Sequence, residues 1–125
     1  MEPVYYEVTK KDWKLYQERL PKWQEAYMGK LVQEYAQYLQ GKDPASTKFW
    51  TLWKKMREDK KHPGVRCEVS KGTMIDFLMR FLYDGVITDA DLDGFSEELR
   101  KYLVFFRKSI ERMARDLQAE GLERP

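Results

Sequence analysis

The sequence predicts an all-α fold, a single-domain bundle of about five helices. Two observations support this class: apolar residues recur at helical spacing over most of the chain, and Gly or Pro residues separate those segments. The 125 residues fit one domain, covering residues 1–125. Residues 4–8 and 65–69 alternate apolar with polar or charged side chains, so the prediction includes an optional short ribbon that pairs these two segments.

The first two predicted helices meet at Pro21. Thr9 occupies an N-cap position with Asp12 three residues later, which indicates a helix start. Pro21 must either kink this helix or open the next one, because proline lacks the N–H that a helix interior needs and is favoured at a first helical position. We favour an end at about Leu20 and a new helix. A second helix is predicted over residues 22–40, and its apolar residues are Trp23, Tyr27, Leu31, Tyr35 and Tyr38.

Two further helices follow in the middle of the chain. Asp43 and Pro44 predict the start of a third helix, which should end before His62. Its expected buried face consists of Phe49, Leu52, Trp53 and Met56. A fourth helix, over about 71–83, carries enough apolar surface to be the central helix, and Asp84-Gly85 ends it.

The segment DADLDGFSEELR (89–100) allows two interpretations. Carboxylates at its positions 1, 3 and 5, with Gly94 at position 6, match half of a calcium-binding loop. Position 12 should hold a bidentate Glu, but Arg100 stands there and its charge opposes a divalent ion. The other interpretation is a capped helix start at Thr88, which repeats the pattern around Thr9. We adopt this interpretation and predict no metal site.

The last predicted helix runs from Thr88 almost to Gly121. About 32 residues would extend about 48 Å, which exceeds the width of a compact domain of this size. The helix therefore breaks near Ser109, or residues of about 109–121 project from the domain. Its apolar positions are Leu92, Phe95, Leu99, Tyr102, Phe106, Ile110, Met113 and Leu117. Ile110, Met113 and Leu117 are candidate partner contacts, unless they fold back on their own core.

Catalytic chemistry has little support in the residue inventory. The chain has one histidine, His62, and one cysteine, Cys67, so a thiol–imidazole pair would depend on these two. We interpret them as a turn histidine and an unreactive cysteine, and we predict no catalytic residue and no cofactor. The single cysteine, the absence of a secretory pattern at the N-terminus and the absence of an apolar run of about 20 residues predict a cytoplasmic protein that does not enter the membrane.

Charge is unevenly distributed along the chain. Residues 48–66 contain seven basic residues and two acidic ones, a balance of +5, and residues 84–98 contain six acids and no base. Lys54, Lys55, Lys60, Lys61 and Arg66 are candidate contacts to phosphate or nucleic acid. Trp50 is the freer residue for base stacking, because Trp53 shares helical spacing with the expected core. The alternative is that the charged segments are solvated faces that attract each other.

Four segments of the chain resemble a group of short helical bacterial proteins for which no activity is established. They are DWKLYQERLPKWQEAYM (12–28), EDKKHPGV (58–65), DGVIT (84–88) and DLDGFSEEL (91–99). The resemblance spans most of the chain and implies one small bacterial domain, without assigning a site.

Two functional hypotheses follow. The first is a non-enzymatic protein-binding module, a small regulator or adaptor that uses its helix surfaces on a foreign protein or on a second copy through the last helix. The second is a nucleic-acid-binding accessory protein that uses the basic segment over 54–66.

Overall fold

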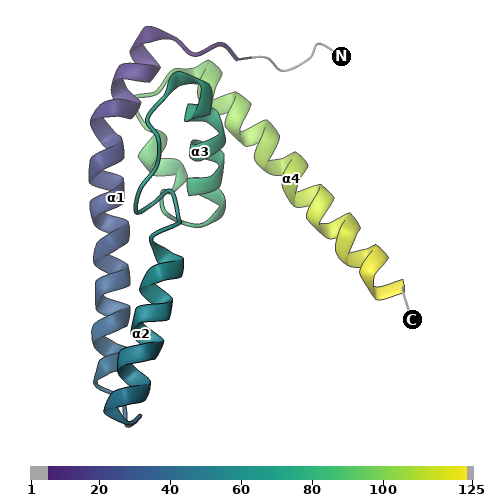
Figure 1. Ribbon diagram of the computed structural model, residues 1–125. Helices are drawn as coiled ribbons and strands as arrows, with labels where there is room; N and C mark the ends of the chain where they lie inside the picture. Colours follow the sequence, from purple (N-terminus) through teal and green to yellow (C-terminus); the bar gives the residue numbers. More distant parts are fainter. Residues whose placement is uncertain (1–5, 124–125) are drawn as a thin grey trace.

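The computed structural model describes residues 6–123, with side chains described as far as residue 119. Four α-helices form the fold: α1 (Lys10–Leu39), α2 (Ala45–Asp59), α3 (Lys71–Tyr83) and α4 (Glu97–Glu123), with a 3-10 turn, η1 (Asp89–Leu92), before α4. No described residue forms a strand, so the all-α class is confirmed. In Figure 1, α2 runs back along the far half of α1, α3 lies beside the near half, and α4 slants away from both. The molecule has the outline of an inverted V, with the α1–α2 hairpin as one arm and α4 as the other.

The predicted break at Pro21 is wrong, because α1 is one continuous helix of 30 residues with Pro21 inside it. The proline removes one backbone donor from the helix interior. Buried side chains lie on both sides of it: Leu20 is 2% exposed and Trp23 is 8% exposed, and both pack in the same core. Pro21 itself faces solvent. Packing of this continuous apolar face outweighs the lost hydrogen bond, so the structure has four α-helices where five were predicted.

The hydrophobic core lies around α3, which occupies the predicted residues and the predicted central position. Tyr16, Leu20 and Trp23 reach it from α1, and Leu99 and Leu103 reach it from α4. The α3 side chains in this core are Met74, Leu78, Phe81 and Leu82. Residues of α2 contribute nothing to the buried cluster. The arms therefore extend from a core that only α1, α3, α4 and the loop before α4 build.

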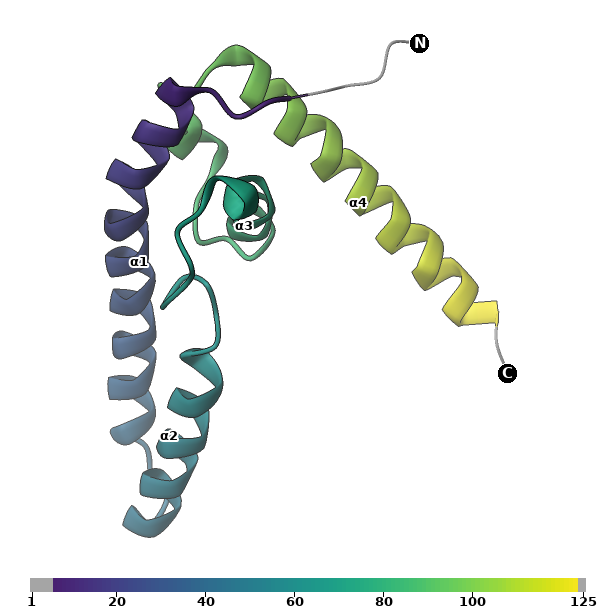
Figure 2. The same cartoon turned by 45° about the horizontal axis from the view of Figure 1, so that its top comes forward.

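The predicted N-cap at Thr9 is confirmed, and the acid that follows it has a further role. Thr9 Oγ1 accepts a hydrogen bond from the Asp12 N–H at 3.1 Å. The Asp12 carboxylate is fully buried and accepts from the Ser96 N–H at 2.8 Å, from the Ser96 hydroxyl, and from the Tyr6 hydroxyl at 2.7 Å. Burial acts to raise the pKa of Asp12, but these hydrogen bonds outweigh it and hold the pKa below its usual value. Asp12 thus joins the start of α1 to the start of α4. These two helix starts lie at the apex of the V (Figure 2).

The start predicted for the last helix is wrong by eight residues. Thr88 does begin a capped turn, since its N–H donates to the Asp91 carboxylate at 2.7 Å, but this turn is the short η1. Gly94 then adopts a φ of 94°, which ends it. Ser96 caps α4 by accepting from the Leu99 N–H at 3.2 Å. Asp89 pairs with Arg107 at 2.8 Å, so the carboxylates at 89 and 91 each have a partner within the protein.

The optional ribbon is not formed by any described residue. Residues 6–8 and 66–70 are irregular, and Val65 belongs to a turn. Residues 4 and 5 of the predicted ribbon lie outside the described part of the chain. Alternation over five residues suited a strand, but these segments instead cover the core, where Tyr6, Val8 and Cys67 pack against it.

Candidate functional site

Four large apolar side chains of α2 are at least half exposed. Phe49 is 63% exposed, Trp50 62%, Trp53 52% and Met56 50%. A groove of about 520 Å³ runs between α2 and the end of α1, and it is lined by Leu39, Ala45, Lys48, Phe49, Leu52, Trp53 and Met56. We call this groove with its exposed aromatic rim the hairpin face. Contiguous exposed apolar area of this kind is typical of contact surfaces.

The prediction that this face is buried is wrong, because α2 packs on α1 through a different side. Asp59 accepts a hydrogen bond from the Tyr35 hydroxyl, and the Lys55 ammonium lies 5.9 Å from the Tyr35 ring centroid. At about 100° per residue, Lys55 and Asp59 lie roughly 100° around the helix from Phe49, Trp53 and Met56. Polar contacts hold the hairpin together, and the apolar side is left to solvent.

The aromatic residues of the hairpin face are ordered against one another. Trp50 packs edge-on against Phe49 at 5.0 Å between ring centroids and against Trp53 at 6.1 Å. The Arg57 guanidinium lies 5.3 Å from the Trp53 ring centroid. These contacts pre-organise the rings, which lowers the entropy cost of binding a partner.

The predicted phosphate contacts are spread over α2 and the segment after it. Lys54, Lys60 and Arg66 are exposed. Lys55 is 3.9 Å from Asp59, and Lys61 is 3.4 Å from Glu58. Part of the basic charge is therefore offset by acids of the same segment.

The second exposed apolar surface is the far half of α4. Ile110 is 38% exposed, Met113 63% and Leu117 65%, and every described side chain from Glu111 to Ala119 is exposed. Ile110, Met113 and Leu117 belong to an apolar series whose members are alternately four and three residues apart, the heptad spacing of helices that pair. We call this series the α4 seam: Leu99, Leu103, Phe106, Ile110, Met113 and Leu117. Leu99 and Leu103 are fully buried in the core. The first residues of the α4 seam are therefore buried in the core, whereas no other helix among the described residues covers its far half.

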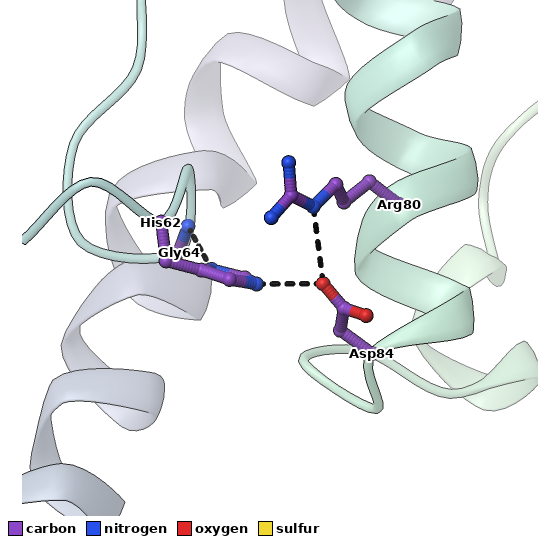
Figure 3. Close-up of polar contacts among 4 residues, drawn as sticks. All are labelled: His62, Gly64, Arg80 and Asp84. Atoms are coloured by element: carbon purple, nitrogen blue, oxygen red, sulfur yellow. Dashed lines mark hydrogen bonds and ion pairs between the residues drawn. The ribbon is translucent and has the colours of Figure 1, made fainter. Parts of the chain in front are cut away.

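His62 anchors the hairpin arm to the core (Figure 3). The Gly64 N–H donates to His62 Nδ1 at 2.9 Å, so Nε2 carries the proton and donates to Asp84 Oδ2 at 2.7 Å. Arg80 Nε donates to the same oxygen at 3.1 Å. Burial acts to raise the pKa of Asp84, but the hydrogen bonds from His62 and Arg80 lower it further than burial raises it. Both ring nitrogens of His62 are occupied, so neither serves as a base in this arrangement.

Cys67 does not meet His62 as a reactive pair. Its sulfur accepts from Gln24 Nε2 at 3.6 Å and lies beside the buried Tyr16. Burial raises the pKa of the Cys67 thiol above its ordinary value. The thiol is therefore protonated near neutral pH, and the reactive thiolate form is disfavoured.

Comparisons with protein-family models, curated proteins and solved structures found no match for this chain. The resemblance to short bacterial helical proteins stays a prediction. Among the described helices, none has the combined length and apolar character that a bilayer crossing requires.

Proposed function

We propose that this chain is a small non-enzymatic protein-binding module, a regulator or adaptor that acts through helix surfaces. The observation that carries the proposal is the hairpin face, where four large apolar side chains are at least 50% exposed around a groove of about 520 Å³. A rim of Trp, Phe and Met with an adjacent Arg has the composition of binding hot spots. Following the sequence-based expectation, we place this module in the cytoplasm.

The core supports the proposal because it does not depend on the hairpin face. No residue of α2 is buried, so the fold needs none of the apolar side chains that α2 carries outward. Exposed apolar groups that add nothing to folding carry a solubility cost, which binding a partner removes. The occupied nitrogens of His62 and the raised pKa of Cys67 favour a binding role over catalysis by these groups.

A photo-crosslinking amino acid in place of Trp50 tests this proposal in the cell of origin. Trp50 packs against Phe49 and Trp53, which line the groove, and is 62% exposed, so the probe replaces no core contact. We expect adducts of discrete mass that are lost when Met56→Glu is added. The same probe in place of Gln33, an exposed residue of α1, is the control and should give no such adduct. A Trp50 probe that yields the same adducts as the Gln33 probe would remove the proposal.

A nucleic-acid-binding accessory protein is the second candidate. The observation that favours it is the exposure of Trp50 and Trp53 beside Lys54, with Lys60 and Arg66 also exposed, which would combine stacking with phosphate contacts. Fluorescence anisotropy with single-stranded DNA and RNA should then show affinity that falls steeply with salt and drops in Lys54→Glu/Lys60→Glu. The control is Lys22→Glu/Lys30→Glu on α1. Binding that is undetectable at low salt would eliminate this candidate.

A further inference from the structure

We propose that the occupant of the hairpin face is α4 of a second copy of this chain, and that two copies interlock as a two-fold dimer. Each copy would lay the exposed half of its α4 seam along the hairpin face of the other. The inference rests on the proposed function, because it names the partner of the same surface. Three observations carry it: the exposed area, the matching apolar faces and the charge distribution.

The exposed area is larger than that of a compact monomer. The accessible surface is 9723 Å², whereas a compact monomer of 15.1 kDa exposes about 7,100 Å². The difference, roughly 2,600 Å², is large beside the roughly 800 Å² that each partner loses in a standard interface. In Figures 1 and 2 the α1–α2 hairpin and α4 extend from the core as separate arms, an arrangement that exposes more surface than a compact shape does. A dimer that covers both arms is therefore large enough to be stable.

The two exposed apolar surfaces complement each other, and each copy carries one of each. The hairpin face is a groove with an aromatic rim, and the α4 seam is a ridge formed by Ile110, Met113 and Leu117. Ridges on one helix pack into grooves between helices. Within one copy the two surfaces stand on different arms. A two-fold axis makes each contact occur twice, which covers both surfaces of both copies and leaves neither open to further growth.

Charge disfavours a parallel pairing of α4 with α4. Residues 48–66 have a balance of +5, while the 84–98 segment at the base of α4 carries six acids and no base. In two V-shaped copies that interlock head to tail, α2 runs parallel to the other copy's α4, and the acidic segments of the two copies lie at opposite ends of the dimer. A parallel α4–α4 coiled coil would instead place the two acidic segments side by side. An antiparallel one would have only the exposed positions 110–117, about two turns, which is too short for a stable coiled coil.

Sedimentation equilibrium of the intact chain tests the dimer. We expect a mass of about 30 kDa, twice that of the 15.1 kDa chain. Trp53→Glu and Met113→Glu, which alter one surface each, should weaken the dimer at least about tenfold. Val69→Glu is the matched control, because Val69 is 50% exposed but lies on neither surface, and it should leave the dimer intact. Circular dichroism should show the helix content of the wild type in all three variants.

Mixing the two weakened variants distinguishes the interlocked dimer from other pairings. A Trp53→Glu copy retains its α4 seam, and a Met113→Glu copy retains its hairpin face, so a mixed dimer has one fully wild-type contact. The mixture should therefore dimerise more tightly than either variant alone. Association that depends on Met113 but not on Trp53 would indicate α4–α4 pairing and overturn the proposal, as would a wild-type chain that stays monomeric at micromolar concentration.

The crosslinking experiment separates failure of the dimer from failure of the binding module. A Trp50 probe that yields only the 30 kDa product supports the second copy as occupant. Adducts only with other proteins would overturn the dimer while leaving a protein-binding module. The absence of any adduct specific to the Trp50 probe would remove both.

Discussion

Replacement of Asp12 tests how the two arms are joined at the apex. In Asp12→Ala, the Ser96 N–H, the Ser96 hydroxyl and the Tyr6 hydroxyl lose their common acceptor, which is fully buried. Hydrogen bonds to a charged group contribute about 1.5–3 kcal/mol each, and Tyr6 and Ser96 are half-buried, so water replaces part of the loss. We expect the free energy of unfolding to fall by about 3–4 kcal/mol, a large part of the 5–15 kcal/mol typical of a domain.

Urea denaturation followed by circular dichroism measures this change near neutral pH. Asp12→Asn keeps one carbonyl acceptor and should lose about 1–2 kcal/mol, because only the charge and one acceptor oxygen are removed. Asp76→Ala, at an exposed carboxylate of α3, is the control and should stay within about 0.5 kcal/mol of wild type. An Asp12→Ala protein that unfolds within 1 kcal/mol of wild type would refute the idea that this carboxylate holds the apex together.

Three further predictions concern the hairpin arm and the response to acid. Pro21→Ala should stabilise the protein by about 2 kcal/mol in urea denaturation, because it restores a helix donor, whereas a helix broken at this position would show little change. Gly64→Ala should cost about 1–3 kcal/mol, because its Cβ would lie 2.6 Å from Tyr27 Cδ1. Gly72→Ala, where the added Cβ meets nothing within 4 Å, is its control and should be neutral or slightly stabilising. The pKa of Asp84 is lowered in the folded protein, so its contribution to stability is complete above about pH 4 and is lost as the pH falls through the folded value. Asp84→Asn should therefore flatten the acid limb of a plot of urea midpoint against pH, and an unchanged limb would contradict the role assigned to this carboxylate.

The helical class and most helix boundaries followed from local information in the sequence. Thr9 caps α1, and α3 spans Lys71–Tyr83 as predicted, because caps, turn residues and helical periodicity act within a few residues. Pro21 shows the limit of this reasoning. Its local preference for a helix start is opposed by burial of Leu20 and Trp23 against α3 and the loop before α4, which are distant in the chain. The outcome therefore depended on tertiary packing.

The candidate site was predictable in part. The sequence placed Ile110, Met113 and Leu117 on one side of a helix that could project, and the structure leaves all three exposed. The same periodicity assigned Phe49 and Trp53 to the core, because an apolar stripe has the same spacing whether its own chain or another covers it.

What the amino-acid sequence determined by itself is which side of each helix is apolar, since that depends only on the order of residues and the helical repeat. The tertiary structure alone decided which of those sides are covered. Polar contacts of Asp59 with α1 rotate the apolar side of α2 away from the body, and α4 leaves α3 beyond Ile110. Both outcomes depend on helix directions that are set by residues far apart in the chain, such as Asp12 with Ser96 and His62 with Asp84.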